Sequence, residues 1–166
     1  MSNPDGIPLL PEVNFFQFSK SSSGYAQRQN MQIGQINPLA IGVAAFSYFL
    51  LGGLWYSPLC FGKAWMRANG FKADDLRRGN AAVIFSVSFL AALVMATNLA
   101  FFLADPKTTV GWGATAGALA GVGWAAMAIL VLGLFERRPW RWMLINGSYQ
   151  IVALTLMGLI IGGWRK

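Results

Sequence analysis

Four apolar stretches, each about as long as a membrane-spanning helix, fill most of the chain after residue 36. They lie at about residues 38–58, 81–103, 110–135 and 143–164. A helix needs about 20 apolar residues to cross about 30 Å of hydrocarbon, and each stretch is close to that length or longer. The sequence therefore predicts an all-α integral membrane protein, in which four transmembrane helices form an up-down antiparallel bundle.

The composition agrees with a membrane location. Hydrophobic residues make up 55% of the chain, and the mean hydropathy is +0.48. Charged residues make up only 11%, which is about half the usual share in soluble domains. The net charge of +7 does not indicate nucleic-acid binding, because the basic residues lie between the apolar stretches rather than along one polar face. Membrane lipids are the expected surroundings.

Residues 1–36 differ from the rest of the chain. Three prolines and the run Ser21–Gly24 disfavour regular structure, so we expect an extended or irregular N-terminal arm before a membrane domain at 37–166. This arm is either a disordered tail or a strap that lies on a partner protein. In the second case, its apolar side chains would bind the partner: Leu9, Leu10, Phe15, Phe16 and Phe18.

Side chains that commonly serve in catalysis or metal binding are scarce in this chain. The chain has no histidine, which removes the commonest general base and the usual haem ligand, and Cys60 is its one cysteine. No charged residue falls well inside an apolar stretch, whereas proton relays and ion pathways usually need one. We therefore predict neither an enzyme nor a metal site nor a cofactor. Contacts with a bound lipid, quinone or pigment stay open, but without histidine ligation.

Small residues recur at helical spacing in the third and fourth stretches. Gly113, Gly117 and Gly121 lie four residues apart, and Gly158 and Gly162 repeat this spacing. Residues four apart share one face of a helix, and glycines on that face let two backbones approach closely. These glycines are predicted to pack helices together. The contact could lie inside one bundle, in a homodimer, or against another protein.

Neutral polar residues are the remaining candidates inside the membrane. Asn98, Asn146, Tyr149 and Gln150 are expected to point inward and to bond across helices, because an unpaired amide in hydrocarbon is costly. A ligand site made by the same side chains is the alternative. Trp124, near the middle of the third stretch, is expected in the core, and stacking on a pigment, quinone or lipid tail is its alternative role.

An aromatic and basic segment follows the first stretch. Trp55, Tyr56 and Pro58 should end this helix at the membrane surface, where amphipathic rings are favoured. Lys63 and Arg67 flank Trp65, a pattern typical of a short interfacial helix whose cations meet lipid phosphates. Anchoring to lipid is the first interpretation of these six residues, and a small-molecule pocket is the second.

The same segment carries a family resemblance. Its residues are Asn37-Pro38-Leu39-Ala40, then Gly53-Leu54-Trp55-Tyr56-Ser57-Pro58, then Phe61-Gly62-Lys63-Ala64-Trp65. This pattern resembles the start of an uncharacterised group of small membrane proteins, domain-of-unknown-function family 1761. In length and span order the resemblance covers residues 37–164. It implies a four-helix membrane bundle with a Trp-Tyr-Ser-Pro turn, and it implies no activity.

The basic residues predict an orientation. Eight of them flank the spans on one side: Lys63, Arg67, Lys72, Arg77, Arg78, Arg137, Arg138 and Arg141. Four lie on the other side: Arg28, Lys107, Arg165 and Lys166. Loops rich in Lys and Arg stay in the cytoplasm. Loops 59–80 and 136–142 are therefore predicted to be cytoplasmic and both termini to lie outside, in a bacterial inner membrane.

These observations favour a non-catalytic role. The first hypothesis is an accessory or structural subunit of a larger membrane complex of respiratory or photosynthetic type, docked through its small-residue helix faces and its N-terminal arm. The alternative is a small oligomeric permease, or a membrane protein that binds lipid or another small molecule.

Overall fold

The computed structural model describes residues 36–72, 74–75 and 79–164, and residues 35–166 form one compact unit. The predicted arm residues Leu9, Leu10, Phe15, Phe16 and Phe18 lie outside the described residues. Within the described residues every regular element is a helix: α2 (Pro38–Trp55), α3 (Gly62–Asn69), α4 (Ala81–Phe102), α5 (Val110–Ala120), η2 (Gly121–Ala126), α6 (Met127–Phe135) and α7 (Trp140–Gly163). The four expected apolar stretches are confirmed as helices long and apolar enough to cross a membrane.

Side chains just before the helices explain where they begin. The Asn37 side chain accepts hydrogen bonds from the first amides of α2, and Thr109 caps α5 through the Trp112 amide at 3.1 Å. Asp74 and Asp75 precede α4, but neither of them caps it. Asn80 is the cap, and it accepts from the Val83 amide at 3.3 Å. Asp75 is too far upstream and binds the Lys72 amide instead.

The helix bounds differ most from the predicted spans in two places, and a third span with the predicted bounds is irregular inside. The first helix ends at Trp55 rather than at residue 58, because the chain turns through Ser57 and Pro58. The last helix begins at Trp140, directly after Pro139, and so is longer than expected. The third span is one apolar segment of 26 residues, but its middle is the π-helix η2. A π-helical turn widens a helix and often marks a functional position.

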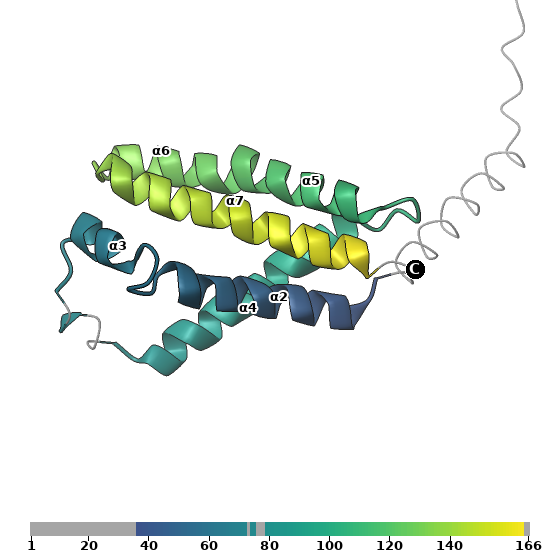
Figure 1. The fold of residues 1–166 in the computed structure, drawn as a ribbon, viewed down its shortest axis with the longest axis horizontal. Helices are drawn as coiled ribbons and strands as arrows, with labels where there is room; N and C mark the ends of the chain where they lie inside the picture. The colour runs from purple at the N-terminus through teal and green to yellow at the C-terminus, as the bar shows by residue number, and fades with distance from the viewer. Residues whose placement is uncertain (1–35, 73, 76–78, 165–166) are drawn as a thin grey trace, which may run out of the picture. The chain divides into compact units, whose positions relative to one another are not determined.

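The long helices pack in a definite order of neighbours. α4 packs on α2, α2 packs on α7, and α7 packs on α5 and η2. In Figure 1, α2, α7 and the α5–α6 segment run side by side, whereas α4 crosses α2 at an angle. The turn between α6 and α7 lies at the same end as α3, and the connection between α4 and α5 lies at the opposite end (Figure 1).

The main cluster of buried apolar side chains lies in one half of this unit, although Met143, Ile145 and Tyr149 of α7 are buried in the other half. It uses the first half of α2 and of the third span with the second half of α4 and of α7, near the α4–α5 connection. Many of its residues are alanines, which let helices approach closely. The largest fully buried side chains are Leu103 and Met157. The other half, near α3, is held together differently.

Glycines make the contact between α5 and α7. A Cβ at Gly113 or Gly158 would meet the other residue's carbonyl oxygen, and a Cβ at Gly162 would lie 2.8 Å from the Thr109 carbonyl oxygen. Near the start of η2, a Cβ at Gly121 would lie 2.7 Å from the Ile151 Cα. The two small-residue faces therefore pack against each other within one chain.

Candidate functional site

A groove of about 670 Å³ lies between α2 and α4, mainly in the half of the unit near α3. One wall comes from the end of α2 and the other from α4, and Tyr149 of α7 contributes between them. The lining residues are all uncharged: Tyr48, Phe49, Gly52, Gly53, Tyr56, Ile84, Phe85, Ser88, Ala91, Met95 and Tyr149.

The groove exists because α4 leaves the bundle toward its N-terminus. Its buried residues begin only at Ala92, and most residues before that point are exposed. Large rings separate the two helices here. The Phe49 ring meets Phe85 and Phe89 edge-on, with ring centroids 5.7 and 6.1 Å apart. Alanines on α4 allow close packing in the second half, and phenylalanines prevent it in the first.

Hydrogen bonds between neutral side chains join α2 to α7 beside the groove. The Tyr48 hydroxyl donates to Gln150 Oε1 at 3.1 Å, and the Tyr56 hydroxyl donates to Asn146 Oδ1 at 2.8 Å. The Tyr149 hydroxyl donates to the Tyr48 carbonyl oxygen at 3.0 Å. These bonds give each of the three phenols a partner on a neighbouring helix. Because each phenol donates its proton, its oxygen lone pairs remain free to accept.

The Tyr149 ring is the centre of an aromatic cluster. Its centroid lies 5.1 Å from that of Tyr48, 5.3 Å from that of Tyr56 and 6.1 Å from that of Trp55. Gly52 makes room for this ring, because a Cβ there would lie 2.9 Å from the Tyr149 hydroxyl oxygen. The Tyr149 side chain of α7 is buried against α2, and it also lines the groove.

The sequence profile of a family described as "Protein of unknown function (DUF1761)" matches residues 39–162. The chain belongs to the DUF1761 family. The expected resemblance is thereby confirmed over most of the chain. No curated protein and no solved structure matches it.

In this DUF1761 protein, the residues predicted to anchor lipid divide into two groups. Trp55 and Tyr56 face α7, and the Trp55 indole N–H donates to the Ile145 carbonyl oxygen at 3.1 Å. They connect helices and are half-buried. Lys63, Arg67 and Pro58 are exposed. Trp65 is also half-buried, and its ring packs against those of Tyr56 and Phe71: the centroid distances are 5.5 and 5.6 Å.

The amide side chains that were predicted to bond across helices also fall into two groups. Asn146 and Gln150 accept hydrogen bonds from α2 and its end, as expected of inward-facing groups. For Asn98 the expectation was wrong. Its side chain is exposed and donates to the Val94 carbonyl oxygen of its own helix at 2.9 Å. Trp124 was also placed wrongly, because it is 82% exposed rather than in the core. It lies in η2, whose π-helical turn changes the register of the face it presents.

One contact that positions the site was not predicted. The Trp142 indole N–H donates to Asn69 Oδ1 at 3.0 Å, and Asn146 donates to the Trp142 carbonyl oxygen at 2.7 Å. The first bond attaches α3 to α7, and the second lies within α7 and holds Asn146, which accepts from Tyr56. The only sequence signal was an amide one helical turn after Trp65, which the interfacial interpretation did not use.

The charges of the DUF1761 protein lie at the ends of the helices rather than in the groove. Arg138 pairs with Glu136 at 2.9 Å and lies over the Trp142 ring, 5.6 Å from its centroid.

Tyr56 follows the last residue of α2, and its burial raises the pKa of its phenol above the usual value. Its hydroxyl therefore stays protonated and remains a donor to Asn146.

Proposed function

We propose that this DUF1761 protein crosses a membrane four times in up-down order and binds a lipid in the groove between α2 and α4, without catalysing a reaction. The groove carries the proposal: it is about 670 Å³, uncharged and bordered by hydroxyl groups. This volume lies within the ~300–1,000 Å³ that small-molecule sites usually have. The short α4–α5 and α6–α7 connections support antiparallel neighbours at those two places in the up-down order.

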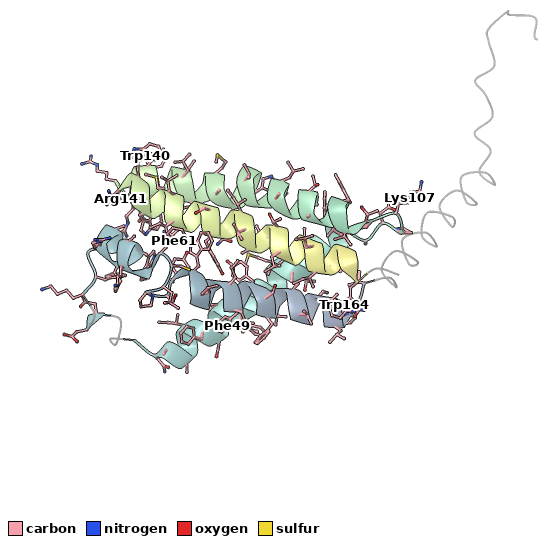
Figure 2. The ribbon with its side chains drawn as sticks, in the orientation of Figure 1. Phe49, Phe61, Lys107, Trp140, Arg141 and Trp164 are labelled. Atoms are coloured by element: carbon pink, nitrogen blue, oxygen red, sulfur yellow. The ribbon has the colours of Figure 1, made fainter. Side chains whose placement is uncertain are left out.

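We propose the orientation that the basic residues indicate. Loops 59–80 and 136–142 would face the cytoplasm of a bacterium, with both termini outside its inner membrane. The described cations Lys63, Arg67, Arg137, Arg138 and Arg141 are exposed around α3 and the α6–α7 turn. In Figure 2, Arg141 and Lys107 lie at opposite ends of the helices. The groove would then open toward the cytoplasmic leaflet.

The length of the groove indicates which lipid would fill it. Along α4 it runs from Ile84 to Met95, which is about 16 Å at a rise of ~1.5 Å per residue. This is about half of the ~30 Å hydrocarbon thickness. A groove one leaflet deep that begins near the membrane surface fits one lipid of that leaflet. Because its walls are parts of two diverging helices, the lipid could enter from the side.

Two variants on neighbouring residues test the proposal. Ala91 lines the groove, so Ala91→Trp should fill it, whereas Leu90 is 60% exposed and Leu90→Trp should point into the bilayer. Native mass spectrometry of protein released from mild detergent should find one retained lipid on the wild type and on Leu90→Trp. Ala91→Trp should lose it. Equal lipid retention in all three proteins would contradict the proposal.

The accessory-subunit hypothesis remains a second proposal. It has support in exposed aromatic residues on the outer face of the third span, where Trp124 is 82% and Phe135 is 86% exposed. The small-residue faces of α5 and α7 already contact each other, so a partner or a second copy would have to use another surface. Gentle solubilisation followed by native gels distinguishes the two proposals: a subunit would migrate with its complex.

A further inference from the structure

The cations of α3 lie on the face that its packing leaves free. Trp65 and Asn69 are four residues apart and share one face of this helix. The Trp65 ring packs on that of Tyr56 at 5.5 Å, and the Asn69 side chain accepts from an indole of α7 at 3.0 Å. Lys63 and Arg67 have the same spacing on another face, and both are exposed. The packing contacts therefore hold α3 with two cations turned away from α7.

A second group of cations lies beside α3, around the α6–α7 turn. The Trp142 indole, which bonds to α3, also lies under the Arg138 guanidinium, 5.6 Å from the ring centroid. Arg141 directly precedes Trp142 and is exposed. In Figure 2, Arg141 lies at the end of the helices that carries α3. The two groups belong to one region, which we call the basic surface: Lys63, Arg67, Arg137, Arg138 and Arg141.

Acidic side chains do not balance the basic surface. Arg138 pairs with Glu136, whereas the other four cations form no ion pair with any residue that the structure describes. A cluster of unpaired cations attracts anions. A guanidinium matches the oxygens of a phosphate especially well, because it can donate two parallel hydrogen bonds. The charge of this surface is therefore complementary to a phosphate group.

Exposed apolar side chains beside the basic surface indicate that a lipid carries this phosphate. Leu59, shortly before α3, is 87% exposed, and Trp140, next to Arg141, is 62% exposed. Side chains of this kind beside cations are favoured where lipid headgroups meet acyl chains. A soluble phosphate would leave them in water, whereas a phospholipid would pair with the cations and cover the apolar side chains together.

We infer that the basic surface binds the headgroup phosphate of an anionic phospholipid, as a lipid site separate from the groove. The phosphate oxygens accept hydrogen bonds from the guanidinium and ammonium groups, and the acyl chains lie against Leu59 and Trp140. The inference rests on the proposed membrane crossing, but it does not depend on a lipid in the groove.

Native mass spectrometry of the delipidated full-length protein in mild detergent tests this inference. The protein is titrated with phosphatidylglycerol or with phosphatidylcholine, two lipids with the same acyl chains and different net charge. Because several cations act together, phosphatidylglycerol should bind about tenfold more tightly or better. An equal concentration of inorganic phosphate should not displace it. Equal affinities for the two lipids, or displacement by inorganic phosphate, would overturn the inference.

Cations at the two ends of the helices provide matched variants. Lys63→Gln on α3 and Arg141→Gln on α7 each remove one charge from the basic surface. Each should weaken phosphatidylglycerol binding about fivefold, which corresponds to the ~1 kcal/mol that a basic residue contributes near an anionic membrane surface. Lys107→Gln removes one charge at the opposite end (Figure 2) and should bind like the wild type. Equal effects of the three substitutions would indicate attraction by net charge alone and would contradict a site at the basic surface.

The groove variants separate this inference from the proposed function. Ala91→Trp should lose the groove lipid and keep the preference for phosphatidylglycerol. If that preference is absent while Ala91→Trp still loses its lipid, the basic surface is not a lipid site and the groove proposal stands. If Ala91→Trp and Leu90→Trp retain lipid equally while the preference depends on Lys63, the groove proposal is wrong and the basic surface stands.

Discussion

At the scale of single residues, phenol–amide pairs in the half of the unit near α3 bond α2 and its end to α7. Tyr56 with Asn146 and Tyr48 with Gln150 each combine a phenol donor with an amide acceptor. Hydrogen bonds of this kind in membranes contribute about 0.6 kcal/mol on average and up to about 1.7 kcal/mol. Their joint effect is to set which faces of the two helices meet, rather than to add much stability.

A double-mutant cycle measures this pairing. Tyr56→Phe combined with Asn146→Leu should show a coupling energy of about 0.5–1.5 kcal/mol, because each substitution removes the same 2.8 Å bond. Unfolding by SDS in mixed micelles gives the free energies. The control cycle combines Tyr56→Phe with Gln150→Leu, whose side chains do not bond each other. Equal coupling in both cycles would show that the pairing with Asn146 is not specific.

Adjacent glycines give a second test at this scale. Gly52→Ala places a methyl group 2.9 Å from the Tyr149 hydroxyl oxygen, whereas a Cβ at Gly53 has no atom within 4 Å. We expect Gly52→Ala to lower the free energy of unfolding by about 1–3 kcal/mol, because the packed ring must move. Gly53→Ala should leave it unchanged or raise it by up to about 1 kcal/mol. The same SDS titration applies, and similar losses for both variants would contradict the crowding at Gly52.

Residue type alone predicted the polar cluster in part. Asn146, Tyr149 and Gln150 lie on α7, which carries many of the buried residues, so pointing inward was the better expectation. Asn98 lies on an exposed face and satisfies its amide through the Val94 carbonyl oxygen. This local bond was available to every such side chain, and the sequence could not show which of them would use it.

At the scale of helices, the glycine repeat predicted a close contact but left its partner open. A substitution now tests the internal packing. A Cβ at Gly117 would meet the Leu154 carbonyl oxygen, whereas a Cβ at Gly111 in the same helix has only the Thr109 Oγ1 at 3.9 Å. We expect Gly117→Ala to cost about 3 kcal/mol or more, because two backbones must separate. Gly111→Ala should cost little.

Stability and oligomeric state must be measured together for this pair of variants. SDS titration reports the fold of one chain, and chemical crosslinking in native membranes reports association. If Gly117→Ala keeps the stability of the wild type but abolishes a crosslinked dimer, the glycine face packs between copies instead of inside the chain.

The divergence of α4 was not predictable from its apolar pattern. Its first and second halves are similarly hydrophobic, and hydropathy does not distinguish a helix face that packs on protein from one that meets lipid. What separates the halves is side-chain size: Ala92, Ala96 and Ala100 are buried, whereas Phe85 and Phe89 meet Phe49 edge-on. The groove therefore follows from the position of a few rings relative to another helix.

At the scale of the whole molecule, the proposals about lipid depend on orientation. The residues that line the groove lie toward the α3 end of α2 and α4, so under the proposed function the side of the membrane on which α3 lies decides which leaflet supplies the lipid. Cys60 is the chain's one cysteine, and it is exposed just before α3. The natural protein therefore carries its own topology probe.

Under the proposed orientation, in which α3 lies in the cytoplasm, labelling of Cys60 with a membrane-impermeant maleimide should succeed in inside-out vesicles and fail in spheroplasts. The matched control combines Cys60→Ser with Lys107→Cys. Lys107 is exposed at the opposite end of the helices (Figure 2), so its cysteine should react in spheroplasts only. The reverse labelling pattern would mean that α3 lies outside the cytoplasm and that the groove faces the outer leaflet. Labelling of both cysteines from the same side would contradict the up-down order, because the second helix would no longer separate them.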